Sequence, residues 1–209
     1  MRFQLKEKRI RDKILKMYIP LKVPKGLTAV DPIQWDLAII GDVESFEFLE
    51  KVFLISAELR ENECIYITTV KSIPLEYREI WKMGIFDLDI LIVNRSHTHI
   101  KEKVWETIVE GLRYIKGEVI QYLPTKIEVE KVPDFWLTDR RLSATRRGKK
   151  FILQTNSITF EKLAYDIRVG MTGFKNEESY NFQKHIHEDW IGTRKDNGFN
   201  FLYYFIDEQ

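Results

Sequence analysis

The alternation of apolar, strand-like runs with amphipathic helical segments between residues 34 and 131 constrains the fold more than any other feature. The strand-like runs are WDLAII, CIYITTV, DLDILIV and EVIQYL. Apolar residues recur at helical spacing between them, and we predict a helix that Asp42 or Ser45 caps and that runs to about Glu61. This order is typical of a sheet with crossover helices. The sequence therefore predicts an α/β fold with a central, mostly parallel sheet, and a mixed α+β fold is the alternative.

The N-terminal segment has the spacing of an amphipathic helix. Phe3, Ile14 and Met17 fall near one stripe of residues 2–17, while lysines and arginines occupy other positions. Pro20 then ends the segment, because proline cannot donate the backbone hydrogen bond of a helix interior. We therefore predict a helix over residues 2–17.

The last third of the chain changes character. A polar, cationic segment is followed by a strand-like run, FILQTN, a short helix at residues 159–169 and an apolar closing run, FNFLYYFI. These elements either complete the same sheet or form a small lobe of their own. We predict a single domain of residues 1–209, and the alternative is an α/β core of residues 1–131 with an α+β extension of residues 132–209.

Composition limits the classes of function. With 209 residues and 44% hydrophobic residues, the chain can bury a substantial core. The net charge of only +1 gives no overall attraction to nucleic acid or to an anionic membrane. The single cysteine, Cys64, excludes an intrachain disulfide and a zinc site built from several cysteines. No apolar run reaches the roughly 18 residues of a membrane span and no secretory signal is evident, so we expect a cytoplasmic protein without a membrane partner.

Charge is organised locally, although the total nearly cancels. Residues 1–25 contain nine lysines or arginines and two acids, and we call them the basic block. Residues 26–63, the acidic block, contain nine acids and two cations. The two blocks either face each other in the fold or present separate surfaces to different partners.

Four glutamates of the acidic block form a candidate partner-binding surface. They are Glu44, Glu47, Glu58 and Glu61, which fall near one outward face by helical spacing. An acidic helix face can cover a cationic site on another protein, with electrostatic attraction speeding the association. The ordinary alternative is a solvated helix face.

All four histidines lie in two His-x-His pairs. The pairs are His97 with His99 and His185 with His187. In a strand, residues i and i+2 share a face, so such a pair can direct two nitrogens at one divalent metal ion. His185, His187 and Asp189 are the candidate ligands, and Asp87 or Asp89 is an alternative carboxylate. Chance occurrence of a short pattern is the competing explanation.

A cationic cluster lies between residues 140 and 150. It consists of Arg140, Arg141, Arg146, Arg147, Lys149 and Lys150. Such a cluster can hold the phosphates of a nucleic acid or nucleotide, and Phe135, Trp136 and Phe151 stand close enough in the sequence to stack on bases. The competing interpretation is a solvated loop whose arginines pair with the acidic helix.

These observations leave three hypotheses. The first is a non-enzymatic protein-binding or inhibitory module, of the immunity-like or viral and mobile-element accessory kind, that acts through segregated charged surfaces. It is favoured because the sequence lacks a phosphate-binding glycine loop, a nucleophile elbow and a His-Glu-x-x-His motif. The second is metal-dependent phosphodiester cleavage by the His-x-His pairs. The third is nucleic-acid binding through residues 140–150. A divalent metal is expected only under the second, and no other cofactor is expected.

Overall fold

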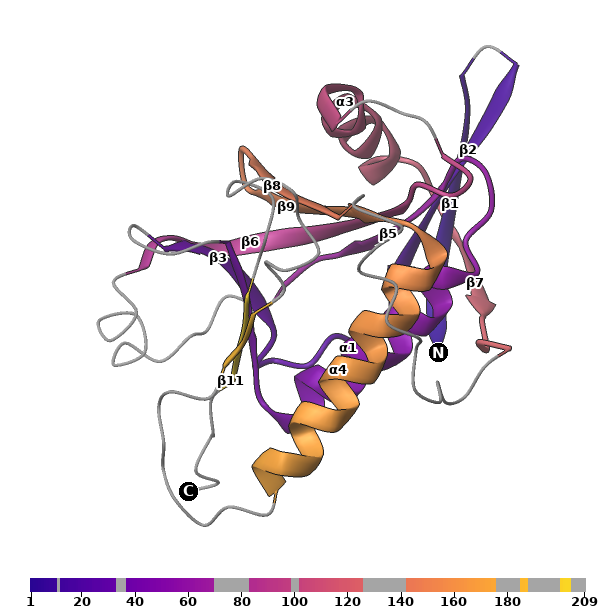
Figure 1. Ribbon diagram of the computed structural model, residues 1–209. Coiled ribbons are helices and arrows are strands. Elements are labelled where there is room, and N and C mark those ends of the chain that lie inside the picture. Colours follow the sequence, from indigo (N-terminus) through magenta and orange to yellow (C-terminus); the bar gives the residue numbers. More distant parts are fainter. Residues whose placement is uncertain are drawn as a thin grey trace.

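A computed structural model of the chain describes residues 1–10, 12–32, 37–69, 83–98, 102–125, 142–175, 185–187 and 200–203. Within these residues, strands build a sheet that has helices on both faces (Figure 1). The strands are β1 (Arg2–Ile10), β2 (Lys13–Pro20), β3 (Thr28–Pro32), β4 (Ala38–Gly41), β5 (Glu63–Ile67), β6 (Met83–Asn94), β7 (Glu118–Gln121), β8 (Ser143–Arg147), β9 (Lys150–Thr155), β10 (His185–His187) and β11 (Asn200–Tyr203). The helices are α1 (Val43–Ala57), α3 (Glu102–Arg113) and α4 (Ser157–Lys175).

The sheet is mostly antiparallel. The described strands follow the order β10-β11-β4-β3-β6-β5-β2-β1-β7, and β9 with its neighbour β8 joins the sheet at β6. Among these strands, β11 with β4, β2 with β5 and β6 with β9 run parallel, and the other pairs are antiparallel. The predicted mostly parallel sheet is therefore wrong, and the fold is mixed α+β.

The burial of the central strands explains this error. Every residue of β5 is buried, and so are residues 90–94 of β6, because helices cover both faces of the sheet there. A strand that is buried on both faces has a continuous apolar sequence, as strands of parallel sheets do, instead of the apolar–polar alternation of a half-exposed antiparallel sheet. The sequence pattern therefore could not distinguish the two kinds of pairing.

β1 and β2 form the two strands of a hairpin, so the helix predicted for residues 2–17 is also wrong. β1 and β2 pair antiparallel along their length. Phe3 and Leu5 are buried in β1, and Leu15 and Met17 in β2, which is the two-residue period of a strand. The chain reverses between these pairs, and a single helical period drawn through both strands put the exposed Ile14 on one stripe with Phe3 and Met17, which belong to opposite core layers.

Capping side chains begin both long helices. The Asp42 carboxylate accepts hydrogen bonds from the amide of Ser45 at 2.8 Å and from its hydroxyl at 2.5 Å, so α1 begins where the sequence predicts. The side-chain oxygen of Asn156 accepts the amide of Thr159 at 2.8 Å at the start of α4. α1 ends at Ala57, earlier than predicted.

The predicted short helix of the last third is longer than the sequence indicates. α4 spans 19 residues and continues through Gly170 and Gly173, beyond the predicted end at residue 169. Met171 in this last part is buried in the core that α4 shares with α1. Tertiary packing of this kind offsets the low helix propensity of glycine.

The sheet separates the core into two layers, and helices cover each of them. α1 and α4 lie side by side on one face of the sheet, and α3 lies on the other (Figure 1). Ile90 and Ile92 of β6 belong to the core under α1 and α4. Leu91 and Val93 belong to the core under α3, together with Trp105. Alternation along β6 thus supplies both layers.

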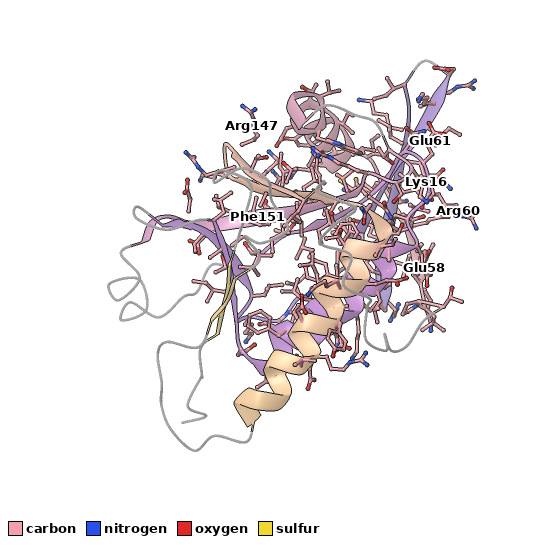
Figure 2. The ribbon with its side chains drawn as sticks, in the orientation of Figure 1. Lys16, Glu58, Arg60, Glu61, Arg147 and Phe151 are labelled. Carbon is pink, nitrogen blue, oxygen red and sulfur yellow. The ribbon has the colours of Figure 1, made fainter. Side chains whose placement is uncertain are left out.

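The described strands of the last third join the same sheet as the earlier strands. β9 pairs with β6, β11 pairs with β4, and α4 packs against α1. Gly148 forms the β8–β9 turn with a φ of 55°, a backbone conformation that favours glycine. Arg147 and Phe151 of this hairpin point to opposite sides of the sheet (Figure 2). The single-domain organisation stays a prediction.

Candidate functional site

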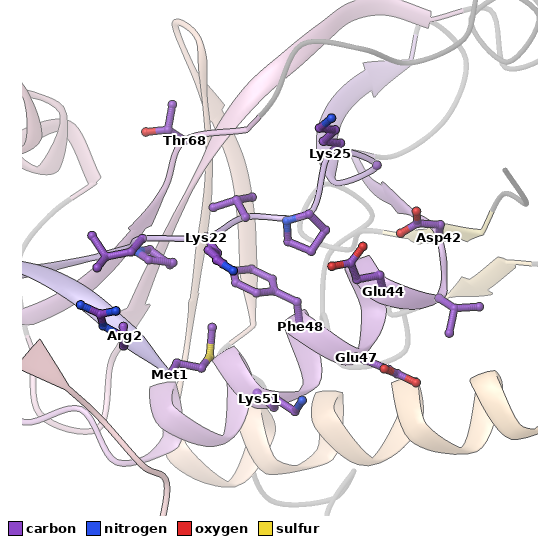
Figure 3. Close-up of a pocket in the computed structure, with 16 residues that line it drawn as sticks. Met1, Arg2, Lys22, Lys25, Asp42, Glu44, Glu47, Phe48, Lys51 and Thr68 are labelled. Atoms are coloured by element: carbon purple, nitrogen blue, oxygen red, sulfur yellow. The ribbon is translucent and has the colours of Figure 1, made fainter. Parts of the chain in front are cut away.

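An open groove of about 1710 Å³ lies between the loop that follows β2 and the first turns of α1 (Figure 3). Its lining includes Met1, Pro20, Leu21, Lys22, Val23, Pro24, Lys25, Asp42, Val43, Glu44, Glu47, Phe48 and Thr68. Three lining residues directly follow the carboxyl ends of strands: Leu21 follows β2, Asp42 follows β4 and Thr68 follows β5. Concave sites of this size at strand ends are common places for ligands.

Local sequence builds each wall of the groove. The loop wall is fixed to β1, because the amide of Leu21 donates to the carbonyl of Arg2 at 3.0 Å. Two prolines stiffen this loop, and the amide of Leu27 donates to the carbonyl of Pro24 at 3.3 Å before β3 begins. On the helix wall, a Cβ at Gly41 would come within 2.5 Å of the Ser45 Cβ, so glycine permits the tight β4–α1 connection.

Charges of both signs line the groove. The cations are Arg2, Lys22, Lys25 and Lys51, and the acids are Asp42, Glu44 and Glu47. Figure 3 shows Lys22 and Lys25 on the loop side, with the carboxylate of Glu44 turned toward that side. The basic and acidic blocks of the sequence thus face each other across this groove. No ion pair joins these four cations to a carboxylate within the part of the chain that the structure describes.

Apolar side chains lie between these charges. Leu21 is 45% exposed at the groove, and Phe48 is buried beneath it. Met1 and Val23 add further apolar surface, and both pack against the large core. A ligand that fills the groove therefore needs apolar groups and charges of both signs.

The four glutamates of the predicted acidic surface lie in two places. Glu44 and Glu47 are on the groove wall, whereas Glu58 and Glu61 follow the last residue of α1. Glu58 Oε1 accepts the amide of Thr125 at 2.5 Å. Glu61 Oε1 lies 3.0 Å from Nζ of Lys13. Glu44 and Glu47 therefore line the groove, whereas Glu58 and Glu61 contact distant segments of the chain.

The cationic cluster of residues 140–150 also divides. Arg140 and Arg141 lie outside the described residues, Arg146 and Lys150 are ion-paired, and Arg147 and Lys149 are exposed. Nε of Arg146 lies 2.5 Å from the Asp31 carboxylate. Nζ of Lys150 lies 2.7 Å from the Glu110 carboxylate. The ion-pair partners therefore come from β3 and α3, and the acidic helix that the competing interpretation named does not supply them.

The histidine pairs are described only in part. His185 and His187 form β10, a strand, which is the local structure that the metal hypothesis requires. His97 is exposed in the turn after β6. His99 and Asp189 lie outside the described residues. Within the described part of the chain, no group of three His, Cys, Asp or Glu side chains is arranged to hold a metal ion. The histidine site stays a prediction.

The two aspartates of DLDILIV occupy different environments. Asp87 has a φ of 62° where β6 changes partner from β3 to β9, and its Oδ1 is buried without a hydrogen-bond partner among the described residues. Asp89 accepts the Tyr66 hydroxyl at 2.5 Å and the Thr69 amide at 3.2 Å. Burial, and secondarily the contact with Asp89, raise the pKa of Tyr66. Asp89 therefore has a structural role on the α3 side of the sheet.

Sequence reasoning missed the loop wall of the groove. The segment PLKVPKG, residues 20–26, was interpreted only as a break in regular structure. Its signal was the combination of two lysines with two prolines, which together present cations on a stiff backbone. Its position opposite Glu44 depends on the β1–β2 hairpin, which the predicted N-terminal helix concealed.

Comparisons with known proteins find no relative of this chain: no protein-family model, no curated protein and no solved structure matches it. Among the helices that the structure describes, none is long and apolar enough to cross a membrane.

Proposed function

We propose that this chain is a non-enzymatic protein-binding module, of the immunity-like or accessory kind, and that its groove receives a segment of a partner protein. The observation that carries the proposal is the groove itself, which opposes Lys22 and Lys25 to Glu44 across an apolar floor. A polypeptide segment can supply acidic, basic and apolar side chains together. A small anion or a nucleic acid would meet unfavourable carboxylates on the helix wall.

The mixture of charges favours specific recognition over general attraction. The net charge of the whole chain is only +1, so long-range steering toward a charged partner is weak. Complementary charges at short range instead fix the register of a bound segment and exclude segments of the wrong polarity. Apolar contacts with Leu21 and Val23 would then supply much of the affinity.

A photo-crosslinking experiment tests the proposal. A benzophenone side chain replaces Leu21 in the groove, or Ile158 on α4, which is 52% exposed and does not line the groove. Irradiation in cells of the source organism should give a defined protein adduct from position 21 and not from position 158. Equal adducts at both positions, or none at position 21, would contradict the proposal.

Charge reversal then tests the recognition with the purified partner. Lys25→Glu and Glu44→Lys should each weaken the Kd at least about tenfold, which is about 1.4 kcal/mol. The double variant K25E/E44K restores the net charge and reverses the polarity of the groove, so it should also bind weakly. Full affinity of the double variant would show that only net charge matters and would refute recognition by the groove.

A further inference from the structure

A second charged surface lies on the opposite face of the sheet, around the C-terminal half of α3. Its cations come from three distant parts of the chain: Lys8 from β1, Arg113 from α3, and Arg147 and Lys150 from the β8–β9 hairpin. Glu110 connects two of these parts, because its Oε1 lies 2.7 Å from Nζ of Lys150 and 3.9 Å from Nη1 of Arg113. The folded chain thus gathers charges that the sequence shows in separate segments.

Strand alternation places Arg147 on this face. Arg147 pairs directly with Lys150 across the hairpin, and cross-strand partners share a face of the sheet. Lys150 reaches Glu110 on α3, and Ile152, two residues further along β9, belongs to the core under α3. Arg146 lies on the other face, where it binds Asp31. Figure 2 shows the same division, with Arg147 and Phe151 directed to opposite sides.

The end of β1 places Lys8 beside α3. Lys6, on the same face two residues earlier, donates from Nζ to the carbonyl of Arg113 at 2.5 Å. A Cβ atom on Gly111 would lie 2.7 Å from Nζ of Lys8. The Lys8 side chain therefore crosses the surface of α3 at that glycine. Lys6 is buried and its ammonium binds the carbonyl at the end of α3, whereas Lys8 is half-buried.

Two carboxylates on this face, Glu110 and Asp89, already have partners. Lys150 is 6% exposed and its ammonium binds Glu110, whose pKa this hydrogen bond lowers. Asp89 accepts the Tyr66 hydroxyl and the Thr69 amide. The exposed arginines Arg113 and Arg147 can therefore contact a ligand: Arg113 lies 3.9 Å from Glu110 at the surface, and Lys150 beneath the surface balances the charge of that carboxylate.

Tyr114 adds an exposed aromatic ring next to these cations. It follows Arg113 directly and is 88% exposed, the most exposed of the large apolar side chains that the structure describes. A ring without protein cover beside arginines is the combination with which proteins bind unpaired nucleotides: the cations contact phosphates and the ring stacks on a base.

We infer that this surface, defined by Lys8, Arg113, Tyr114 and Arg147, binds a single-stranded nucleic acid. The phosphate backbone runs past Arg113 and Arg147, and a base stacks on Tyr114. This site is independent of the protein-binding groove, since the two lie on opposite faces of the sheet and share no residue. The phosphodiester backbone and the unpaired base are common to RNA and DNA.

Fluorescence anisotropy with labelled single-stranded RNA and DNA tests the inference on the full chain. R113A/R147A removes two charges from this surface, and K22A/K25A removes two charges from the groove as a matched control. We expect saturable binding by the unaltered chain and by the groove variant. R113A/R147A should weaken binding at least tenfold and reduce the salt dependence by about one unit for each cation removed. Whichever oligonucleotide binds more tightly identifies the sugar.

Tyr114→Ala separates stacking from charge. It should weaken binding about fivefold or more while leaving the salt dependence unchanged. Thermal unfolding of each variant checks that the fold is retained. Equal losses for K22A/K25A and R113A/R147A, tighter binding to a duplex, or no saturable binding by the unaltered chain would each overturn the inference. None of these outcomes bears on the partner bound in the groove.

Discussion

The face of the sheet under α1 and α4 carries a large apolar cluster, whereas the face under α3 carries a smaller one bordered by buried lysines. Both buried lysines among the described residues, Lys6 and Lys150, lie on the α3 face. Contacts between charged groups are screened by salt and change with pH, whereas apolar burial is not screened in this way. The two faces should therefore respond differently to mutation and to solution conditions, although they share the same strands.

The largest expected effect tests the apolar face. Phe53 is fully buried and stacks on Phe160 with ring centroids 5.9 Å apart. Phe53→Ala should lower the free energy of unfolding by about 3–5 kcal/mol, through lost burial and the cavity that remains. Urea denaturation should give the same loss at low and high salt. Ile158→Ala, at an exposed position of α4, is the control and should change stability by less than about 0.5 kcal/mol.

The next effect tests the α3 face. Tyr66→Phe removes the hydroxyl that donates to Asp89 at 2.5 Å and leaves that carboxylate with the more distant Thr69 amide. We expect a loss of about 1–3 kcal/mol at neutral pH. Tyr114→Phe, at an exposed ring, should have no measurable effect. A loss for Tyr66→Phe as small as that for the control would show that the Asp89 contact does not stabilise this face.

The same tyrosine predicts an alkaline response. Burial, and then Asp89, raise the pKa of Tyr66, so the folded chain keeps this proton where the unfolded chain loses it. The resulting stability is present below about pH 10, the unfolded value for tyrosine, and is lost as the pH rises further. Denaturation curves above that pH should show a steeper loss for the unaltered chain than for Tyr66→Phe. Parallel losses would contradict the assignment.

A smaller effect concerns the start of α1, which supports the apolar face and forms one wall of the groove. Asp42→Ala removes the carboxylate that accepts the amide and hydroxyl of Ser45. The free energy of unfolding should fall by about 1 kcal/mol, as for other helix caps. Glu44→Ala, an exposed residue of the same turn, should have a smaller effect. An equal loss for both variants would mean that general charge, and not capping, stabilises this end.

Local patterns in the sequence predicted some elements of the fold well. Asp42 at the start of α1, the β-branched run of β5 and the apolar run of β6 were each assigned correctly from residue type and spacing. Strand pairing was not predictable in this way, because helices on both faces removed the polar alternation that marks antiparallel strands. The N-terminal hairpin was missed because the periods of its two strands combined to resemble one helix.

The candidate sites, like the strand pairing, could be predicted only in part from the sequence. Glu44 and Glu47 were identified from charge, but the lysines opposite them belong to a loop that only the folded chain brings near. Arg147 was identified from the cationic cluster, whereas Lys8 and Arg113 join it through β1 and α3. Residue type predicts which side chains can bind a ligand. Assembly of a site depends on contacts between distant segments, and one sequence does not reveal these.

The smallest expected effect distinguishes the two faces by their response to acid. The hydrogen bond from Lys150 lowers the pKa of Glu110 below its ordinary value of 4.5, so this carboxylate stabilises the folded chain above that pH and the contribution is lost as the pH falls below it. The Glu110 side chain is 42% exposed, which limits the effect at neutral pH to less than about 1 kcal/mol.

Glu110→Gln should therefore lower stability slightly at neutral pH and make the loss below about pH 4.5 shallower than in the unaltered chain. Chemical denaturation between neutral and acid pH measures both quantities, and high salt should reduce the difference between the two chains. Glu44→Gln, which changes a carboxylate on the other side of the sheet, is the matched control; an equally shallow acid response in that variant would show that the α3 face has no special sensitivity to charge.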